Sequence, residues 1–340
     1  MTAVLNAKRP RALSFGNLWI SAAIIVVLLL YPVFFGKAMN FGVSTVIFAG
    51  LAMSWNILGG WAGQTSLGHA ALLGVGAYTM TLLAIPERGP AWLQVLGIGN
   101  GAAIAPWWGI LVGMVLAVIL SLIWGSLTFR LQGSYFTLSS IAVALILRLV
   151  AINEDFTGGS QGLFMPDLPT FFGLDLFDRK VEYGLAVGFV VVTLIVTHLI
   201  RRSRTGYALQ AVREDEDGAR ALGIDPARMK LIAFAISAAL TALGGGIYAI
   251  YLQAFEPHTL LELPLSVQIA LMAIIGGRTS LQGPIIGAIV LAVFGEVFRN
   301  LFSSANLLIY GVLILVVTLF APSGIMGLFS RRGRKLGTAR

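Results

Sequence analysis

Residues 107–129 read WWGILVGMVLAVILSLIWGSLTF, and none of these side chains carries a charge. A helix that crosses a bilayer needs ~20 consecutive, predominantly apolar residues. This stretch meets that requirement along its whole length. It therefore predicts a membrane-spanning helix, and it sets the expectation for the rest of the chain.

Nine further apolar segments surround it. The ten segments have the approximate limits 17–36, 38–58, 67–85, 107–129, 133–152, 183–200, 231–252, 265–277, 283–300 and 305–321. Segment 265–277 is short for a full crossing, so it is expected to be broken or re-entrant if it does not span. The sequence predicts an all-α, polytopic transmembrane helix bundle of about ten spans, with a range of eight to ten, forming one transmembrane domain over residues 1–340.

The composition supports membrane residence. Apolar residues make up 57% of the chain and charged residues 11%, whereas a soluble domain carries about 25% charged residues. A soluble protein of this composition would expose large apolar patches and aggregate. The chain has no cysteine, which excludes disulfides, thiol catalysis and zinc–thiolate sites.

The positive charges indicate an orientation. The net charge is +8, and most Lys and Arg residues fall at the termini and in alternate loops if the N-terminus lies inside. Cytoplasmic loops of membrane proteins carry an excess of Lys and Arg, so both termini are expected to be cytoplasmic. The positive net charge is explained by this topology and does not indicate nucleic-acid binding. In this topology residues 153–182 form an external loop and residues 201–230 form an internal loop.

The internal loop has the composition of an amphipathic helix. The stretch TGYALQAVREDEDGARALGI, residues 205–224, places Leu209, Val212, Ala219 and Leu222 on one face. Gly223 suits the position after a helix C-terminus. One interpretation is a coupling helix that gives its apolar face to a groove of a separate ATPase and its charges to the rim. The other is a solvated connector whose charges enforce topology.

Several polar residues lie within the apolar segments or directly beside them. Gln64, Ser66 and His69 lie in a glycine-rich stretch, where they either line a pathway or pack against other helices, since polar groups at membrane depth need a partner or a wet cavity. His69 has no companion ligand at metal-binding spacing. Arg148 is expected to hold an outer gate, to pair with Glu154 or Asp155, or to snorkel to the outer surface.

Four motifs, in this order, resemble one known family. They are GGWAGQTSLGHAALLGVGAY at 59–78, LQGSYFTLSSIAVALILRLV at 131–150 followed by TGGSQG at 157–162, LQAVREDEDGARALGID at 209–225, and IIGGRTSLQGPIIGA at 274–288. With their spacing they resemble the M-type permease subunit of branched-chain amino acid ABC importers. Asp217, Gly218 and the run from Arg278 to Ser280 depart from the usual pattern of that family.

The resemblance implies a non-catalytic subunit of the bacterial inner membrane. It implies a homologous second permease subunit, two ATPase subunits that bind the ATP, an external substrate-binding protein, and no cofactor in this chain. The coupling residues it implies are Arg213, Glu214, Asp215, Glu216, Ala219 and Gly223. The candidate pathway or gate residues are Gln64, Ser66, His69 and Arg148.

Other functions remain as alternatives. Related subunits import urea and short-chain amides, so the substrate stays open. An ion-coupled secondary transporter would require membrane-embedded acids, and Glu296, which Arg299 could pair with, is the one candidate. A passive channel would leave the charged internal helix unexplained, and an intramembrane enzyme would need clustered catalytic groups that the sequence does not show.

Overall fold

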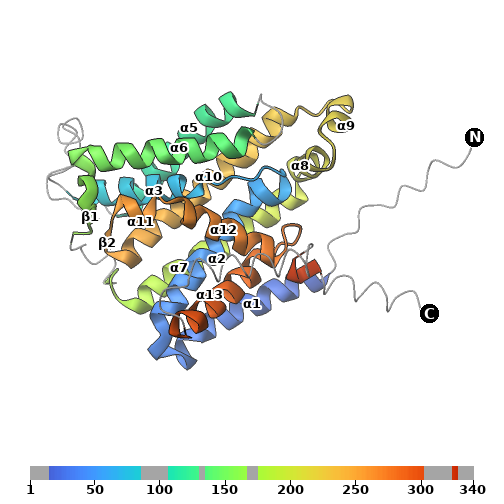
Figure 1. Ribbon diagram of the computed structural model, residues 1–340. Helices are drawn as coiled ribbons and strands as arrows, with labels where there is room; N and C mark the ends of the chain where they lie inside the picture. The colour runs from blue at the N-terminus through green and yellow to red at the C-terminus, as the bar shows by residue number, and fades with distance from the viewer. Residues whose placement is uncertain (1–14, 86–105, 130–134, 167–174, 302–323, 328–340) are drawn as a thin grey trace, which may run out of the picture.

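The computed structural model describes residues 15–85, 106–129, 135–166, 175–301 and 324–327. Its long helices lie roughly side by side in one bundle (Figure 1). The larger helices are α1 (Phe15–Phe34), α2 (Met39–Asn56), α3 (His69–Ala84), α5 (Pro106–Thr128), α6 (Tyr135–Asn153), α7 (Arg179–Arg202), α10 (Pro226–Leu252), α12 (Leu263–Gly276) and α13 (Gly283–Leu301).

The remaining elements are short. They comprise η1 (Gly36–Ala38), η2 (Ile57–Trp61), η3 (Asp155–Thr157), η4 (Gly159–Gln161), α8 (Arg204–Glu214), α9 (Glu216–Ala221) and α11 (Pro257–Leu260). Two strands, β1 (Leu163–Phe164) and β2 (Ala254–Phe255), pair antiparallel. All but the last of the ten predicted segments coincide with a helix, and segment 305–321 lies outside the described residues.

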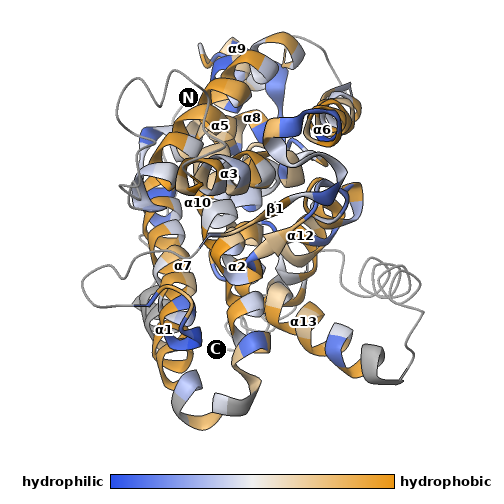
Figure 2. Cartoon of the chain, turned by 90° about the vertical axis from the view of Figure 1, so that its left-hand side faces the viewer, coloured by the Kyte–Doolittle hydropathy of each residue, from blue (hydrophilic) through white to orange (hydrophobic). Residues whose placement is uncertain are grey.

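Six of the described helices are long and apolar enough to cross a membrane, counting α2 with η2 and α11 with α12. Parts of α1 and α13, and the whole of α3, are apolar but shorter. The predicted short segment 265–277 lies in α12, which has 14 residues by itself, but together with α11 it forms a stretch of 20 residues that is long enough to cross. Hydrophobic colour runs along most of the long helices, for example α7 (Figure 2). The chain is a multi-pass membrane protein.

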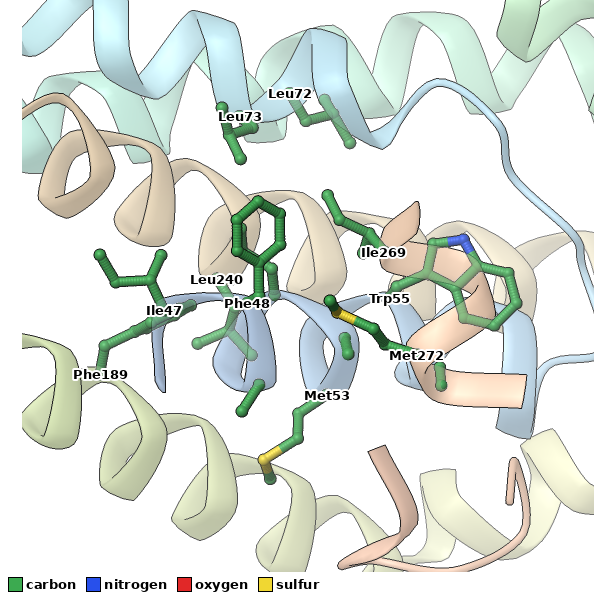
Figure 3. Close-up of a cluster of buried hydrophobic side chains, with 14 of the residues drawn as sticks. Ile47, Phe48, Met53, Trp55, Leu72, Leu73, Phe189, Leu240, Ile269 and Met272 are labelled. Carbon is green, nitrogen blue, oxygen red and sulfur yellow. The ribbon is translucent and has the colours of Figure 1, made fainter. Parts of the chain in front are cut away.

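Helix α2 is the centre of the bundle. It packs against α7, α10, α12 and α13, and its side chains Phe48, Met53 and Trp55 meet residues from the surrounding helices (Figure 3). By contrast α5 and α6 leave most of their apolar surface exposed. In a bilayer such surface can face lipid at no cost, so burial identifies α2 as the core helix.

Close packing explains part of the glycine content. Helix α10 runs along α3 and α5. A Cβ atom added at Gly76 of α3 would lie 2.1 Å from the carbonyl oxygen of Ala242, and one added at Gly245 of α10 would lie 2.1 Å from that of Leu73. Two glycines on facing helices therefore let the backbones touch, as small residues do in membrane interfaces.

The bundle has two distinct ends (Figure 1). One carries α8 and α9, and α1 begins there. The other carries η3, η4, β1, β2 and α11. Polar caps mark where helices begin: the Asp178 carboxylate accepts a hydrogen bond at the start of α7, and that of Asp225 does so at the start of α10, where Pro226 takes the first helical position. Such side-chain acceptors satisfy N–H groups that have no partner within the helix.

Candidate functional site

The internal loop folds as two short helices, so the prediction of one continuous helix is wrong. Asp215 is extended (φ −158°, ψ 112°) and separates α8 from α9. Its carboxylate accepts hydrogen bonds from the N–H groups of Asp217 and Gly218, both at 3.0 Å. This N-cap starts a new helix and stops the first. Gly223 follows α9 with φ +82°, which confirms its expected position after the helix C-terminus.

The apolar face of the loop is mostly used within the chain itself. Leu209, Val212 and Ala219 are almost completely buried, because α8 packs on α7, α10 and η2 and because α9 packs on α10. Leu222, expected on the same face, is 80% exposed. The expectation that this whole face is free for a partner is therefore wrong, and Leu222 is the large apolar residue that remains accessible at the tip.

The charged residues of the loop form specific pairs. The Arg213 guanidinium donates from Nη1 to the carbonyl oxygen of Gly60 at 2.9 Å and lies 3.7 Å from the Glu214 carboxylate. The Glu216 carboxylate accepts from Lys230 Nζ of α10 at 2.5 Å. Lys230 is buried, so this pair fixes α9 to α10. The module formed by α8 and α9 is thereby attached to η2 through Arg213 and to α10 through Glu216.

The stretch after α2 is irregular although it lies inside the bundle. A π-helical turn, η2, is followed by residues 62–68, which are not helical. Hydroxyl groups from other helices pair with this backbone. Ser140 accepts from the N–H of Leu67, Ser266 accepts from that of Ala70, and Thr137 donates to the carbonyl of Thr65, all at 2.8–2.9 Å. Non-helical backbone at membrane depth is tolerated where protein satisfies it in this way.

His69 stands at the centre of this arrangement and is completely buried. Its Nδ1 lies 3.0 Å from Ser66 Oγ and its Nε2 lies 2.9 Å from Ser237 Oγ. Ser237 donates its own proton to the Ser54 carbonyl at 2.7 Å, so it accepts from Nε2–H, and Nδ1 accepts from Ser66. The structure thus brings Ser66 and His69 together and links α3 to α10 and α2.

Gln64 and Arg148 lie apart from the pair formed by Ser66 and His69. Gln64 is half-buried and precedes the buried Ser66. Arg148 of α6 lies 2.8 Å from His258 Nδ1 and 3.5 Å from Glu262. The pairing predicted with Glu154 or Asp155 is wrong, because α11 packs beside α6 and brings His258 and Glu262 to Arg148. The four pathway candidates therefore do not form one cluster.

Some contributors were not predicted from sequence. The Gly60 carbonyl, the buried Lys230 and the serines Ser140, Ser237 and Ser266 come from four separate segments. The serines could have been noticed as small polar residues within apolar helices. The sequence does not show, however, which backbone group each serine contacts. Among the described residues no group of His, Asp and Glu could hold a metal ion.

The chain resembles several known transport proteins. The high-affinity branched-chain amino acid transport system permease protein LivM of Salmonella typhimurium is 27% identical over 89% of this chain and 73% of the relative. LivM of Escherichia coli is 27% identical with the same coverage. LivH of Escherichia coli, described as a permease protein of the same kind of system, is 24% identical over 82% of this chain and 91% of its own length. No solved structure matches the chain.

The bundle of apolar helices has a partly buried irregular segment after α2 and a charged helical module at one end. Together with these relatives it indicates an integral membrane transport permease. The family model described as branched-chain amino acid transport system / permease component matches residues 37–319. The chain belongs to this family. The match includes every motif on which the resemblance was based.

Proposed function

We propose that the chain is the membrane-spanning subunit of a binding-protein-dependent ABC importer that carries branched-chain amino acids across a bacterial inner membrane. The substrate follows from the printed names of the relatives, which concern branched-chain amino acid transport. The chain itself performs no covalent chemistry, and ATP binds to partner subunits. Its similarity to both LivM and LivH supports a second permease of the same fold as partner.

The observation that carries the coupling role is the module of α8 and α9. It is tied to η2 and α10 by Arg213 and Glu216, yet it exposes Leu222 beyond the helix end. A rigid attachment on one side and an exposed apolar tip on the other suit a contact that transmits movement. Two ATPase subunits would bind at this end, one on each permease.

The orientation follows from charge. The end that carries α8 and α9 holds Arg201, Arg202, Arg204, Arg213, Arg220, Arg228 and Lys230. Cytoplasmic loops carry such an excess, so we assign this end, and both termini, to the cytoplasm. The opposite end, with β1, β2 and α11, then faces the external binding protein.

Within this function the four polar candidates have different roles. Gln64, which is half-buried, and Arg148, which is a quarter exposed at its side chain, are accessible enough to meet substrate or to gate its path. Ser66 and His69 are completely buried and act as positioning residues for the irregular segment. Arg148 closes the outer end by joining α6 to His258 and Glu262.

The proposed function is tested by uptake. The permease, its partner permease and the ATPase subunits are reconstituted in vesicles with the binding protein outside. We expect ATP-dependent accumulation of leucine, isoleucine and valine, and none when the binding protein is omitted. Preference for urea or acetamide would reassign the substrate. Uptake that persists without ATP and stops when an ionophore dissipates the ion gradients would contradict an ABC importer.

A further inference from the structure

The described carboxylates at the end that carries α8 and α9 are all engaged within the chain. Glu214 faces Arg213, Glu216 pairs with Lys230, and Asp217 pairs with Arg220 at 2.7 Å. Asp215 and Asp225 accept hydrogen bonds at the starts of α9 and α10. The mixed charge of the loop is therefore largely neutralised internally. What remains at this end is positive.

Arg278 is one of the described cations that remain without an acidic partner at this end. It lies in the turn between α12 and α13 and is exposed. No carboxylate of the described residues lies within 4.0 Å of its guanidinium, whereas five other cations of the described chain have one. A turn that exposes an arginine without an acidic neighbour leaves a charge available to another molecule.

Arg278 and Arg213 approach the same point from different elements. Arg213 donates to the carbonyl oxygen of Gly60, and the carbonyl oxygen of Arg278 lies 2.6 Å from the position that a Cβ atom at Gly60 would take. The surrounding protein, and secondly the charge of Arg213, lower the pKa of Arg278. The Arg213 guanidinium and the backbone of Arg278 thus both meet Gly60 in η2, just after α2. The repulsion between the two positive charges would be relieved by an anion that both arginines bind.

The position of this pair indicates which anion it meets. Helix α2 is the central helix of the bundle (Figure 3), so Gly60 lies toward the middle of the end face. Lipid headgroups contact the perimeter of a bundle, where Arg201 and Arg202 end α7. Gly63, beside Arg213, is exposed and has no side chain to cover the arginine.

We propose that Arg213 and Arg278 together bind a carboxylate of the ATPase subunit. A carboxylate accepts two parallel hydrogen bonds from a guanidinium, and such charge-assisted bonds are stronger than neutral ones. Complementary charge also fixes the register in which two proteins dock. This inference rests on the proposed function and adds the chemistry of the partner surface: an acidic residue beside the pocket that receives Leu222.

The test uses the assembled importer in nanodiscs. The variants are Arg278→Glu, Arg278→Gln and Arg278→Lys. The matched control is Arg228→Glu, another exposed arginine of the same end that has no carboxylate within 4.0 Å among the described residues. The ATPase subunit retained after washes of rising ionic strength is measured together with substrate-stimulated ATP hydrolysis. Thermal unfolding of each variant in detergent checks that the exposed turn still folds.

We expect Arg278→Glu to weaken retention of the ATPase about tenfold or more and Arg278→Gln to weaken it less. Arg278→Lys should weaken it least of the three, because Lys keeps the charge but loses the paired donors, and Arg228→Glu should change it little. Equal retention by Arg278→Glu and Arg228→Glu in an importer that still transports would overturn this inference alone. An effect of Arg278→Glu that occurs only in nanodiscs with anionic lipid would also overturn it, because the ligand would then be a headgroup phosphate. If the unaltered complex shows no ATP-driven uptake, the proposed function fails first.

Discussion

Arg213 of α8 donates a hydrogen bond to the carbonyl oxygen of Gly60 across 2.9 Å. The two residues are 153 positions apart in the sequence. This bond connects the surface module of α8 and α9 to the π-helical turn η2 at the end of the core helix α2. A displacement of the module would therefore act directly on the irregular segment inside the bundle.

Replacing Gly60 by Ala should disturb this connection. An added Cβ atom would lie 2.0 Å from Asn56 Oδ1 and 2.6 Å from the carbonyl oxygen of Arg278, so the η2 backbone must shift and its carbonyl must move from Arg213. We expect uptake to fall several-fold. The measurement is vesicle uptake compared with ATP hydrolysis. Gly184→Ala is the control, since nothing lies within 4 Å of a Cβ there, and equal uptake by the two variants would refute the connection.

Leu222 should matter for docking and not for folding. Because it is 80% exposed, Leu222→Asp should change the free energy of unfolding by no more than about 0.5 kcal/mol. It should nevertheless abolish substrate-stimulated ATP hydrolysis, because a charge enters an apolar contact.

Leu209→Ala, in contrast to Leu222→Asp, should lower the stability of the fold. Leu209 is completely buried, and its truncation should cost about 2–5 kcal/mol of stability. Thermal unfolding in detergent separates the two effects. Stimulated hydrolysis that survives in Leu222→Asp would show that the exposed tip has no partner.

His69→Ala should destabilise the bundle. The change leaves Ser66 and Ser237 without their buried partner and opens a cavity beside Trp55, whose ring lies near that of His69. The loss of stability should be about 2–4 kcal/mol, measured by unfolding in detergent. If stability were unchanged and the preference among leucine, isoleucine and valine shifted instead, His69 would line the pathway.

Arg148→Met should loosen the end of α6 that packs beside α11. The ion pair with Glu262 joins partly exposed side chains, so the loss of stability should stay within about 1 kcal/mol. The loosened helix should let reagents reach buried positions more easily. A cysteine introduced at the buried Ala144 should therefore react faster with a thiol reagent. The chain has no native cysteine, so the signal is specific.

Glu154→Gln serves as the control for that experiment. Glu154 is the neighbour that sequence spacing suggested for Arg148, but in the structure His258 and Glu262 occupy that role. Cysteine reactivity in Glu154→Gln should equal that of the unaltered chain. If Arg148→Met left the reactivity unchanged as well, Arg148 would not hold the end of α6 beside α11.

Local sequence predicted the helices well and their contacts poorly. An uncharged run such as 107–129 forms a helix in a bilayer because its backbone has no other hydrogen-bond partners there, and α5 occupies it. The break at Asp215 could also have been anticipated, since Asp is a favoured N-cap. Competing helix formers on both sides of Asp215 concealed it.

The sequence by itself determined the class of the protein, the position of its helices, the short α12 and the turn at Gly223, because these depend on apolar length and on backbone conformation within a few residues. The tertiary structure alone decided that Leu209, Val212 and Ala219 are buried, that Arg148 meets His258, and that Arg213 meets Gly60. These contacts join segments far apart in the chain. They depend on which helices lie side by side, and that is fixed by packing and by the pairing of buried polar groups across the whole bundle.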